Sequence, residues 1–325
     1  MTPITVRVPA KLNLQLAVGP PRADGYHDLV TVFHAVSLYD EVTVCPAGRD
    51  GVTVTGEWAD RVPGGQDNLA LRAVAALRAV LAGRPGAGSR SGGSRSGGGS
   101  GSGEGNVQIT IAKRIPVAAG LAGGSADAAA ALVACNELWA SGLTQAELGR
   151  VGATVGSDVA FAVLGGTAVG RGRGEQLTPA LVPATRYHWV LAFADGQLPT
   201  PGVYAALDRL RAARDAQPGE PDLDAELMSA LRCGDAALVG KKLSNDLQLA
   251  AISLFPALRK TLAAGLELGA LGALVAGSGP TCAFLAPNAE RALALAVSLS
   301  GAGVCRSVAR VSGPVPGAAV VPAGS

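Results

Sequence analysis

The stretch with the clearest chemical meaning is PVAAGLAGGSADAAAAL, residues 116–132, in which glycines stand directly ahead of an alanine-rich segment. Gly120, Gly123 and Gly124 can take backbone angles that other residues avoid, and they leave amide groups open to a ligand. The alanines favour a helix, whose first turn has unpaired N–H groups and a positive dipole end. We therefore expect a phosphate to bind where this helix begins.

The polar residues near these glycines refine that expectation. No Lys-Ser/Thr pair follows the glycines, so this is not a Walker A loop. Ser125 could cap the helix, or its hydroxyl could face a phosphate or its magnesium ion. Lys113 and Arg114 end the strand-like run NVQITIAKR and either supply positive charge or form a solvated strand end. Asp127 suits the helix dipole but repels a triphosphate, so we expect it to be structural.

The composition indicates a globular chain. Its 325 residues are 48% hydrophobic and 16% charged, enough for two modest domains around a large core. The net charge of +2 and the scattered basic residues argue against nucleic acid or an anionic membrane as the main partner. The beginning of the chain has no signal-peptide pattern, and glycines and Glu267 interrupt the apolar run from Ala264. We therefore expect a soluble, cytoplasmic protein.

Cysteine and histidine usage argues against a structural metal site. The chain has three scattered histidines and five widely spaced cysteines without a CxxC pair, so we expect neither a disulfide framework nor a zinc site or other dedicated metal cluster. A reducing compartment fits this pattern. The cysteines are Cys45, Cys135, Cys233, Cys282 and Cys305.

The elements that must position these residues begin with strands. Alternating polar and apolar residues predict an antiparallel region, with strands at 5–8, 12–18, 29–36, 41–47 and 51–57. Residues 67–81 switch to helical spacing, with Gln66 or Asp67 as the cap. Residues 83–105 are nearly all Gly, Ser and Arg, which predicts a disordered surface insert rather than a flap over the phosphate site.

After the insert, strands and helices are mixed. We expect a strand at 106–112, a long helix from the glycines to about Ser141 and a short helix from Thr144. Beyond residue 174 the pattern predicts further helices and the strands 189–195, 272–279, 282–286 and 305–311. This succession predicts an α+β fold of mixed or antiparallel sheets with helices packed on them. We expect two domains, 1–172 and 173–325.

Separated motifs resemble one family. PVAAGLAGGSADAAAAL resembles the central glycine motif of the GHMP small-molecule kinases, and AGSGPTCAFL, residues 276–285, resembles their C-terminal glycine motif. Segments 8–42, 156–175 and 243–259 resemble the branch that phosphorylates the 2-hydroxyl of a cytidine diphosphate methylerythritol in non-mevalonate isoprenoid biosynthesis. The resemblance covers nearly the whole chain except the insert. It implies a two-domain GHMP kinase fold, ATP as phosphoryl donor, Mg²⁺, and a monomer or homodimer.

The resemblance assigns Lys11 and Asp158 as the catalytic pair. Phosphoryl transfer needs alignment and charge neutralisation, which a carboxylate near the attacking hydroxyl and a lysine near the transferred phosphate can supply. A nearby lysine keeps Asp158 ionised, so we expect it to orient the hydroxyl and accept the proton late. Local sequence alone favours a helix cap for Asp158 and an exposed strand lysine for Lys11.

The resemblance also assigns Asn13, Tyr26, His27 and Thr200 to the acceptor. The Tyr26 ring could stack on cytosine, and the His27 ring nitrogens could read its hydrogen-bonding edge. A hairpin turn and an ordinary turn threonine are the plainer local alternatives. Phe33 is expected in the core.

For the nucleotide, the resemblance assigns Asn68 and Lys113 to the adenine side, and an ordinary helix start is an equal alternative for Asn68. It assigns phosphate binding to the glycine loop, through Pro116, Gly120, Leu121, Ala122, Gly123, Gly124, Ser125 and Ala126. Ala122 stands where the family commonly has glycine, and a positive φ there would be strained. Gly277, Ser278 and Gly279 resemble the family's third motif, which implies that their backbone supports this loop or the substrate. Mg²⁺ is expected to bridge phosphates with few protein ligands.

Other functions remain open at this point. The chain could be a GHMP kinase for homoserine or mevalonate. It could also be a nucleotide-binding regulator without catalytic activity, although the presence of Lys11 and Asp158 argues against a loss of activity. A nucleic-acid role for the insert is weaker, because Arg84, Arg90 and Arg95 have no aromatic residues between them.

Overall fold

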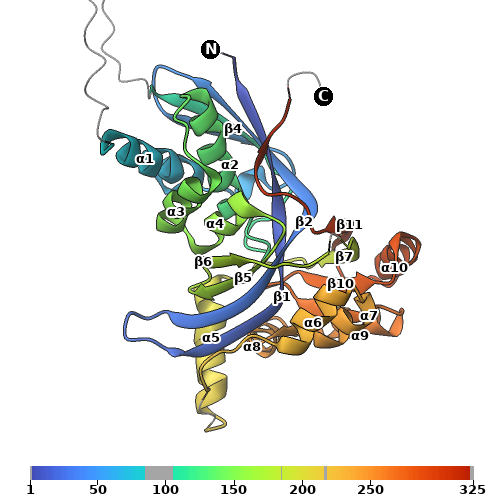
Figure 1. Cartoon of the computed structure of the whole chain (residues 1–325). Coiled ribbons are helices and arrows are strands. Elements are labelled where there is room, and N and C mark those ends of the chain that lie inside the picture. Colours follow the sequence, from blue (N-terminus) through green and yellow to red (C-terminus); the bar gives the residue numbers. More distant parts are fainter. Residues whose placement is uncertain (1, 85–104, 184, 216–217, 323–325) are drawn as a thin grey trace, which may run out of the picture.

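Two β-sheets with helices packed on them organise the chain (Figure 1). The computed structural model describes residues 2–84, 105–183, 185–215 and 218–322. Of the predicted insert, residues 85–104 lie outside the described residues. The mixed α+β class expected from the pattern is confirmed.

The first sheet is built on one long antiparallel pair. The four short segments expected in residues 5–47 join into two strands, β1 (Ile4–Pro21) and β2 (His27–Pro46). Register shifts between Pro9 and Ala10 and between Asn13 and Gln15 bend the pair without ending it. β2 continues the sheet through β4 (Val107–Ala112), which pairs in parallel with β3 (Gly51–Thr55), and also pairs with the hairpin of β5 (Thr167–Gly172) and β6 (Gln176–Pro179).

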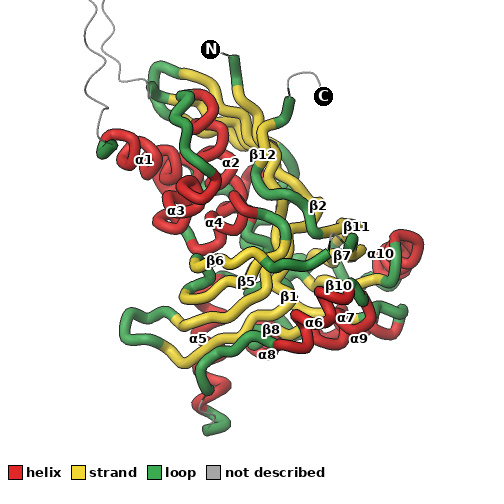
Figure 2. Tube along the Cα trace, viewed as in Figure 1, coloured by secondary structure: helices red, strands yellow, loops and turns green. Residues whose placement is uncertain are grey.

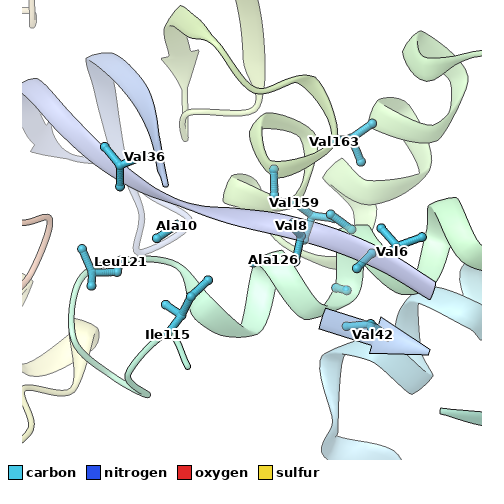
Figure 3. Close-up of a cluster of buried hydrophobic side chains, with 14 of the residues drawn as sticks. Val6, Val8, Ala10, Val36, Val42, Ile115, Leu121, Ala126, Val159 and Val163 are labelled. Carbon is cyan, nitrogen blue, oxygen red and sulfur yellow. The ribbon is translucent and has the colours of Figure 1, made fainter. Parts of the chain in front are cut away.

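Four helices pack together with the first sheet: α1 (Leu69–Ala82), α2 (Gly123–Leu138), α3 (Gln145–Val155) and α4 (Ser157–Leu164). Alanines fill the interior of α2 and are fully buried from residue 128 to 131, which allows close packing. In Figure 3, Ala126 of α2 and Val159 of α4 lie next to Val8 of β1. This core fixes the first turns of α2 and α4 beside β1.

Two expected helix starts are wrong by a few residues. Asn68 caps α1, rather than Gln66 or Asp67, because its side chain accepts the N–H of Ala70. Ser125 is not an N-cap, because α2 already begins at Gly123 after Ala122. Both shifts matter for the site, since they decide which side chains face a ligand.

The second sheet is antiparallel, in the order β11 (Ser307–Gly313), β7 (Tyr187–Phe193), β10 (Cys282–Ala286) and β9 (Gly272–Val275). Its half of the chain also contains α5 (Thr200–Ala212), α6 (Ala225–Cys233), α7 (Ala236–Lys242), α8 (Gln248–Leu254), α9 (Ala257–Glu267) and α10 (Ala289–Gly301). Figure 2 shows most of these helices gathered at the end of the molecule away from α1 to α3.

The two halves share strands. β8 (Ser244–Asn245) and β12 (Ala319–Val320) come from the second half of the chain but pair with β1. The expected domain boundary at residue 172 falls within the β5–β6 hairpin. The second strand of this hairpin, which ends at Pro179, also belongs to the first sheet. All five cysteines are free thiols. In the part of the chain that is described, we find no helix with the length and apolar character needed to span a bilayer.

Candidate active site

One cavity of about 750 Å³ collects most of the predicted site residues. Its wall includes β1, β2, the first turns of α2 and α4, α5 as far as Asp208, and the loop after β9. The predicted residues that line it are Lys11, Asn13, Tyr26, His27, Gly120, Ala122, Gly123, Gly124, Ser125, Asp158 and Thr200. Asn68, Lys113, Pro116, Leu121 and Ala126 are not among its lining residues.

The glycine loop is held against the C-terminal glycine loop. A Cβ on Gly120, whose φ is 78°, would lie 1.8 Å from the carbonyl oxygen of Ala276. Only glycine fits that approach. Ala118 and Ala122 have φ of 52° and 59°, so the strain expected for Ala122 is present, and both residues still line the cavity.

Lys113 lies in a buried ion triad instead of at the cavity. Its Nζ donates to Asp40 Oδ2 and to Asp127 Oδ2, both at 2.6 Å, and the lysine is 1% exposed. Lys113 does not line the cavity, because both acidic side chains already hold its ammonium group, and its contact with the nucleotide stays a prediction. The structural role expected for Asp127 agrees with this triad.

The triad fastens the glycine-rich turn before α2 to the sheet. Asp40 of β2 accepts through Oδ1 from the backbone N–H groups of Arg114 and Ile115, just before the glycine loop. Burial acts to lower the pKa of Lys113, but the charges of Asp127 and Asp40 outweigh it and the pKa is raised. Burial raises the pKa of Asp127 to about 8, despite the charge of Lys113. One ammonium between two carboxylates therefore joins β2, β4 and α2.

The side chain of Asn68 is likewise hydrogen-bonded within the protein, to backbone groups. Its Oδ1 accepts from Ala70 N at 2.9 Å, its Nδ2 donates to the Pro63 carbonyl at 2.9 Å, and it is 3% exposed. The helix-start alternative describes this residue, and its contact with adenine stays a prediction.

Lys11 and Asp158 form the charged pair of the cavity. Lys11 Nζ lies 3.7 Å from Asp158 Oδ2, at the first turn of α4. Lys11 Nζ also donates to Asn13 Oδ1 at 2.6 Å. The side chain of Asp158 is 30% exposed and that of Lys11 only 9%, so the carboxylate is the more accessible partner.

Thr31 of β2 fixes the amide that holds Lys11. Its hydroxyl accepts from Asn13 Nδ2 at 2.8 Å and donates to the Gln15 carbonyl at 2.6 Å. Because Asn13 donates through Nδ2, its Oδ1 is left to accept from Lys11. No local pattern in the sequence indicates this chain of bonds, since Thr31 meets Asn13 only through the pairing of β1 with β2.

Tyr26, His27 and Thr200 lie on the α5 side of the cavity. Tyr26 is 54% exposed, and the Arg173 guanidinium carbon lies 5.2 Å from the centre of its ring. His27 is buried and packs on Tyr204 with ring centroids 5.1 Å apart. Thr200 Oγ1 shares a 2.9 Å hydrogen bond with Ser278 Oγ of the C-terminal glycine loop.

Sequence reasoning missed Arg173, Tyr204 and Asp208, which also line the cavity. Thr200, Tyr204 and Asp208 recur every fourth residue, the spacing that places side chains on one face of a helix. Burial, and then the negative charge of Asp158, raises the pKa of Tyr204.

Comparisons with known proteins agree on one family. Residues 68–166 match the model described as GHMP kinases N terminal domain, and residues 227–305 match GHMP kinases C terminal. A 4-diphosphocytidyl-2-C-methyl-D-erythritol kinase of Nocardia farcinica is 52% identical over 98% of this chain and 97% of its own length. One of Thermobifida fusca, named alike, is also 52% identical, over 98% of this chain and 99% of its own.

Solved structures show the same architecture. A crystal structure of 4-(cytidine 5'-diphospho)-2C-methyl-D-erythritol kinase aligns with a TM-score of 0.70 and 33% identity, over 94% of this chain and 98% of that chain. A homoserine kinase from Cytophaga hutchinsonii aligns with a TM-score of 0.70 at 19% identity, over 99% and 98%. At that identity the likeness describes the fold alone.

Proposed function

Since this chain belongs to the GHMP kinase family, we propose that it transfers the terminal phosphoryl group of ATP to the 2-hydroxyl of 4-diphosphocytidyl-2-C-methyl-D-erythritol. The family makes it a small-molecule kinase with an alcohol acceptor. The choice of acceptor rests on the names of relatives that are 52% identical over nearly the whole chain.

The observation that carries the proposal is the Lys11–Asp158 pair, 3.7 Å apart, in the cavity that the first turn of α2 also lines. The open amides of Gly123 and Gly124 and the dipole of α2 suit a triphosphate there. The carboxylate and the phosphate-binding turn therefore face one space in which a donor and an acceptor can meet.

In this mechanism Asp158 orients the acceptor hydroxyl. A loose transition state needs little prior deprotonation, so Asp158 takes the proton late, as the bond to phosphorus forms. Lys11 stabilises the negative charge on the transferred group, and Asn13 and Thr31 hold its ammonium in place. Because the Lys11 side chain is only 9% exposed, little water competes with the phosphate for it.

Mg²⁺ is proposed to accompany ATP. No group of three or more His, Cys, Asp or Glu suited to a metal occurs among the described residues. The oxygen donors Ser125 and Asp158 do line the cavity, and Mg²⁺ typically binds one or two protein oxygens together with phosphates. These two residues would hold the ion, which supplies charge neutralisation to the phosphates.

A coupled assay of ADP release from purified protein, ATP and Mg²⁺ tests the proposal. We expect turnover with the cytidine diphosphate methylerythritol acceptor, one phosphate added at its 2-hydroxyl, and at most trace turnover with homoserine or mevalonate. Turnover with homoserine or mevalonate in preference would refute the acceptor but keep the family. Nucleotide binding without turnover of any alcohol would indicate a silent regulator. We further propose that the protein is cytoplasmic and forms a monomer or homodimer. Light scattering of the purified protein tests the oligomeric state.

A further inference from the structure

The proposed function leaves one contact of the acceptor site unexplained, between the carboxylate of Asp208 and the buried imidazole ring of His27. Asp208 Oδ1 lies 3.0 Å from His27 Nε2. The side chain of His27 is 5% exposed and that of Asp208 is 38% exposed, and both residues line the cavity. Asp208 is therefore partly open to solvent and within hydrogen-bonding distance of the histidine ring.

This contact determines where the ring carries its hydrogen. An ionised carboxylate can only accept, so His27 must donate through Nε2–H. In the neutral ring Nδ1 then has no hydrogen and can only accept. Asp208 thus converts a ring that could present either a donor or an acceptor into one that presents an acceptor.

The ring and the carboxylate are both held in place. Tyr204, one turn before Asp208 on α5, packs on the imidazole at an interplanar angle of 35°. One turn further along, Arg211 donates to the carbonyls of Val18 and Gly19 at 2.7 and 2.9 Å. These bonds fasten α5 to β1, so Asp208 has a fixed position relative to the strand pair that carries His27.

We propose that Asp208 is a positioning residue that makes the acceptor site select cytosine over uracil, by holding His27 in the tautomer whose Nδ1 accepts a hydrogen bond. The proposal rests on the proposed function, in which His27 reads the base. Cytosine offers an amino group where uracil offers a carbonyl oxygen. A bare Nδ1 can accept from that amino group, whereas it repels the lone pairs of the uracil oxygen.

Direct binding separates this proposal from the question of turnover. Calorimetric titration with CDP and with UDP, in the presence of a saturating non-hydrolysable ATP analogue, measures base preference even if no phosphate is transferred. We expect the wild-type protein to prefer CDP. Asp208→Ala should lose about tenfold or more of that preference, the size of one hydrogen bond to a charged group. Asp208→Asn keeps an oxygen that accepts from Nε2–H and should keep most of the preference.

A second readout follows the tautomer itself. The chain has only three histidines, so ¹⁵N-histidine spectra can be assigned by substitution. We expect Nδ1 of His27 to be the unprotonated nitrogen in the wild-type protein and in Asp208→Asn, but not to be fixed in Asp208→Ala. Arg209→Gln, an exposed neighbour on α5, is the matched control and should behave as wild type in both measurements.

Two results would overturn the proposal. One is a CDP preference that Asp208→Ala and Asp208→Asn both retain in full. The other is a wild-type spectrum in which His27 carries its hydrogen on Nδ1. Failure of the wild-type protein to release ADP would instead count against the proposed function, and it would leave both of these measurements interpretable.

Discussion

The ammonium nitrogen of Lys113 lies 2.6 Å from Asp127 Oδ2, which fastens α2 near its start to the end of β4. The turn that is proposed to bind phosphate is therefore anchored by a buried charge cluster. Gly123 sits directly over this pair, since a Cβ there would lie 3.0 Å from Lys113 Nζ.

Replacing Lys113 by Met should destabilise the fold more than it weakens ATP binding by the folded protein. Removing one partner of a buried charge cluster typically costs about 3–5 kcal/mol. Chemical denaturation measures the free energy of unfolding, and Arg114→Met, the exposed neighbour, is the control. A variant of unchanged stability that no longer binds ATP would instead support the predicted contact between Lys113 and the nucleotide.

Asp127→Asn should change how stability depends on pH. Burial raises the pKa of Asp127 to about 8 in the folded state, whereas the unfolded carboxyl ionises near its ordinary value of 3.8. Between these values the folded protein binds one more proton than the unfolded chain, so stability falls as pH rises and levels off above about 8. We expect the wild type to lose up to about 1.4 kcal/mol per pH unit relative to the variant in that window. Parallel urea titrations at pH 6, 7 and 8 measure the difference, and a constant difference would contradict the assignment.

Asp158→Asn should lower kcat by about 100- to 10,000-fold, the usual contribution of a group that accepts a proton in the transition state. The KM for ATP and the circular dichroism spectrum should stay near the wild-type values. Asp195→Asn removes an exposed carboxylate elsewhere and serves as the control. A rate close to wild type would exclude Asp158 from the transfer step.

Thr31→Val should reduce kcat through Lys11, although Thr31 is fully buried. Without the hydroxyl, Asn13 Nδ2 loses its acceptor and its amide no longer directs Oδ1 at Lys11. We expect about a tenfold loss, equivalent to one hydrogen bond. Steady-state kinetics of Thr31→Val and of Thr110→Val, an exposed strand threonine, measure it. Equal rates for the two variants would remove Thr31 from the positioning of Lys11.

Two substitutions in the glycine loop should act in opposite directions. Ala122→Gly relieves a left-handed alanine, a gain of about 0.5 kcal/mol after the added entropy of the unfolded chain. Gly120→Ala would place a methyl group against the Ala276 carbonyl and should separate the two glycine loops. Thermal melts with and without an ATP analogue compare the variants. A Gly120→Ala protein with wild-type stability would contradict the close approach of the loops.

Local patterns identified the elements but not their joins. The α2 helix, its glycines and the strands β7, β9, β10 and β11 follow from spacing and composition. The merging of the N-terminal segments into β1 and β2 did not follow, because Pro9 and residues 37–40 lie outside the alternating segments of the sequence, while the pairing between β1 and β2 continues past a register shift between Pro9 and Ala10.

The amino-acid sequence by itself determined the mixed α+β fold class and the glycine turn before α2, because these depend on neighbours along the chain. Only the tertiary structure decided which charged side chains reach the cavity. Lys113 and Lys11 both sit in or beside strands, yet Lys113 meets two carboxylates from β2 and α2, whereas Lys11 meets Asp158 at the cavity. The partner of His27 lies 181 residues away on α5, and such a pairing is fixed by packing, which no local pattern records.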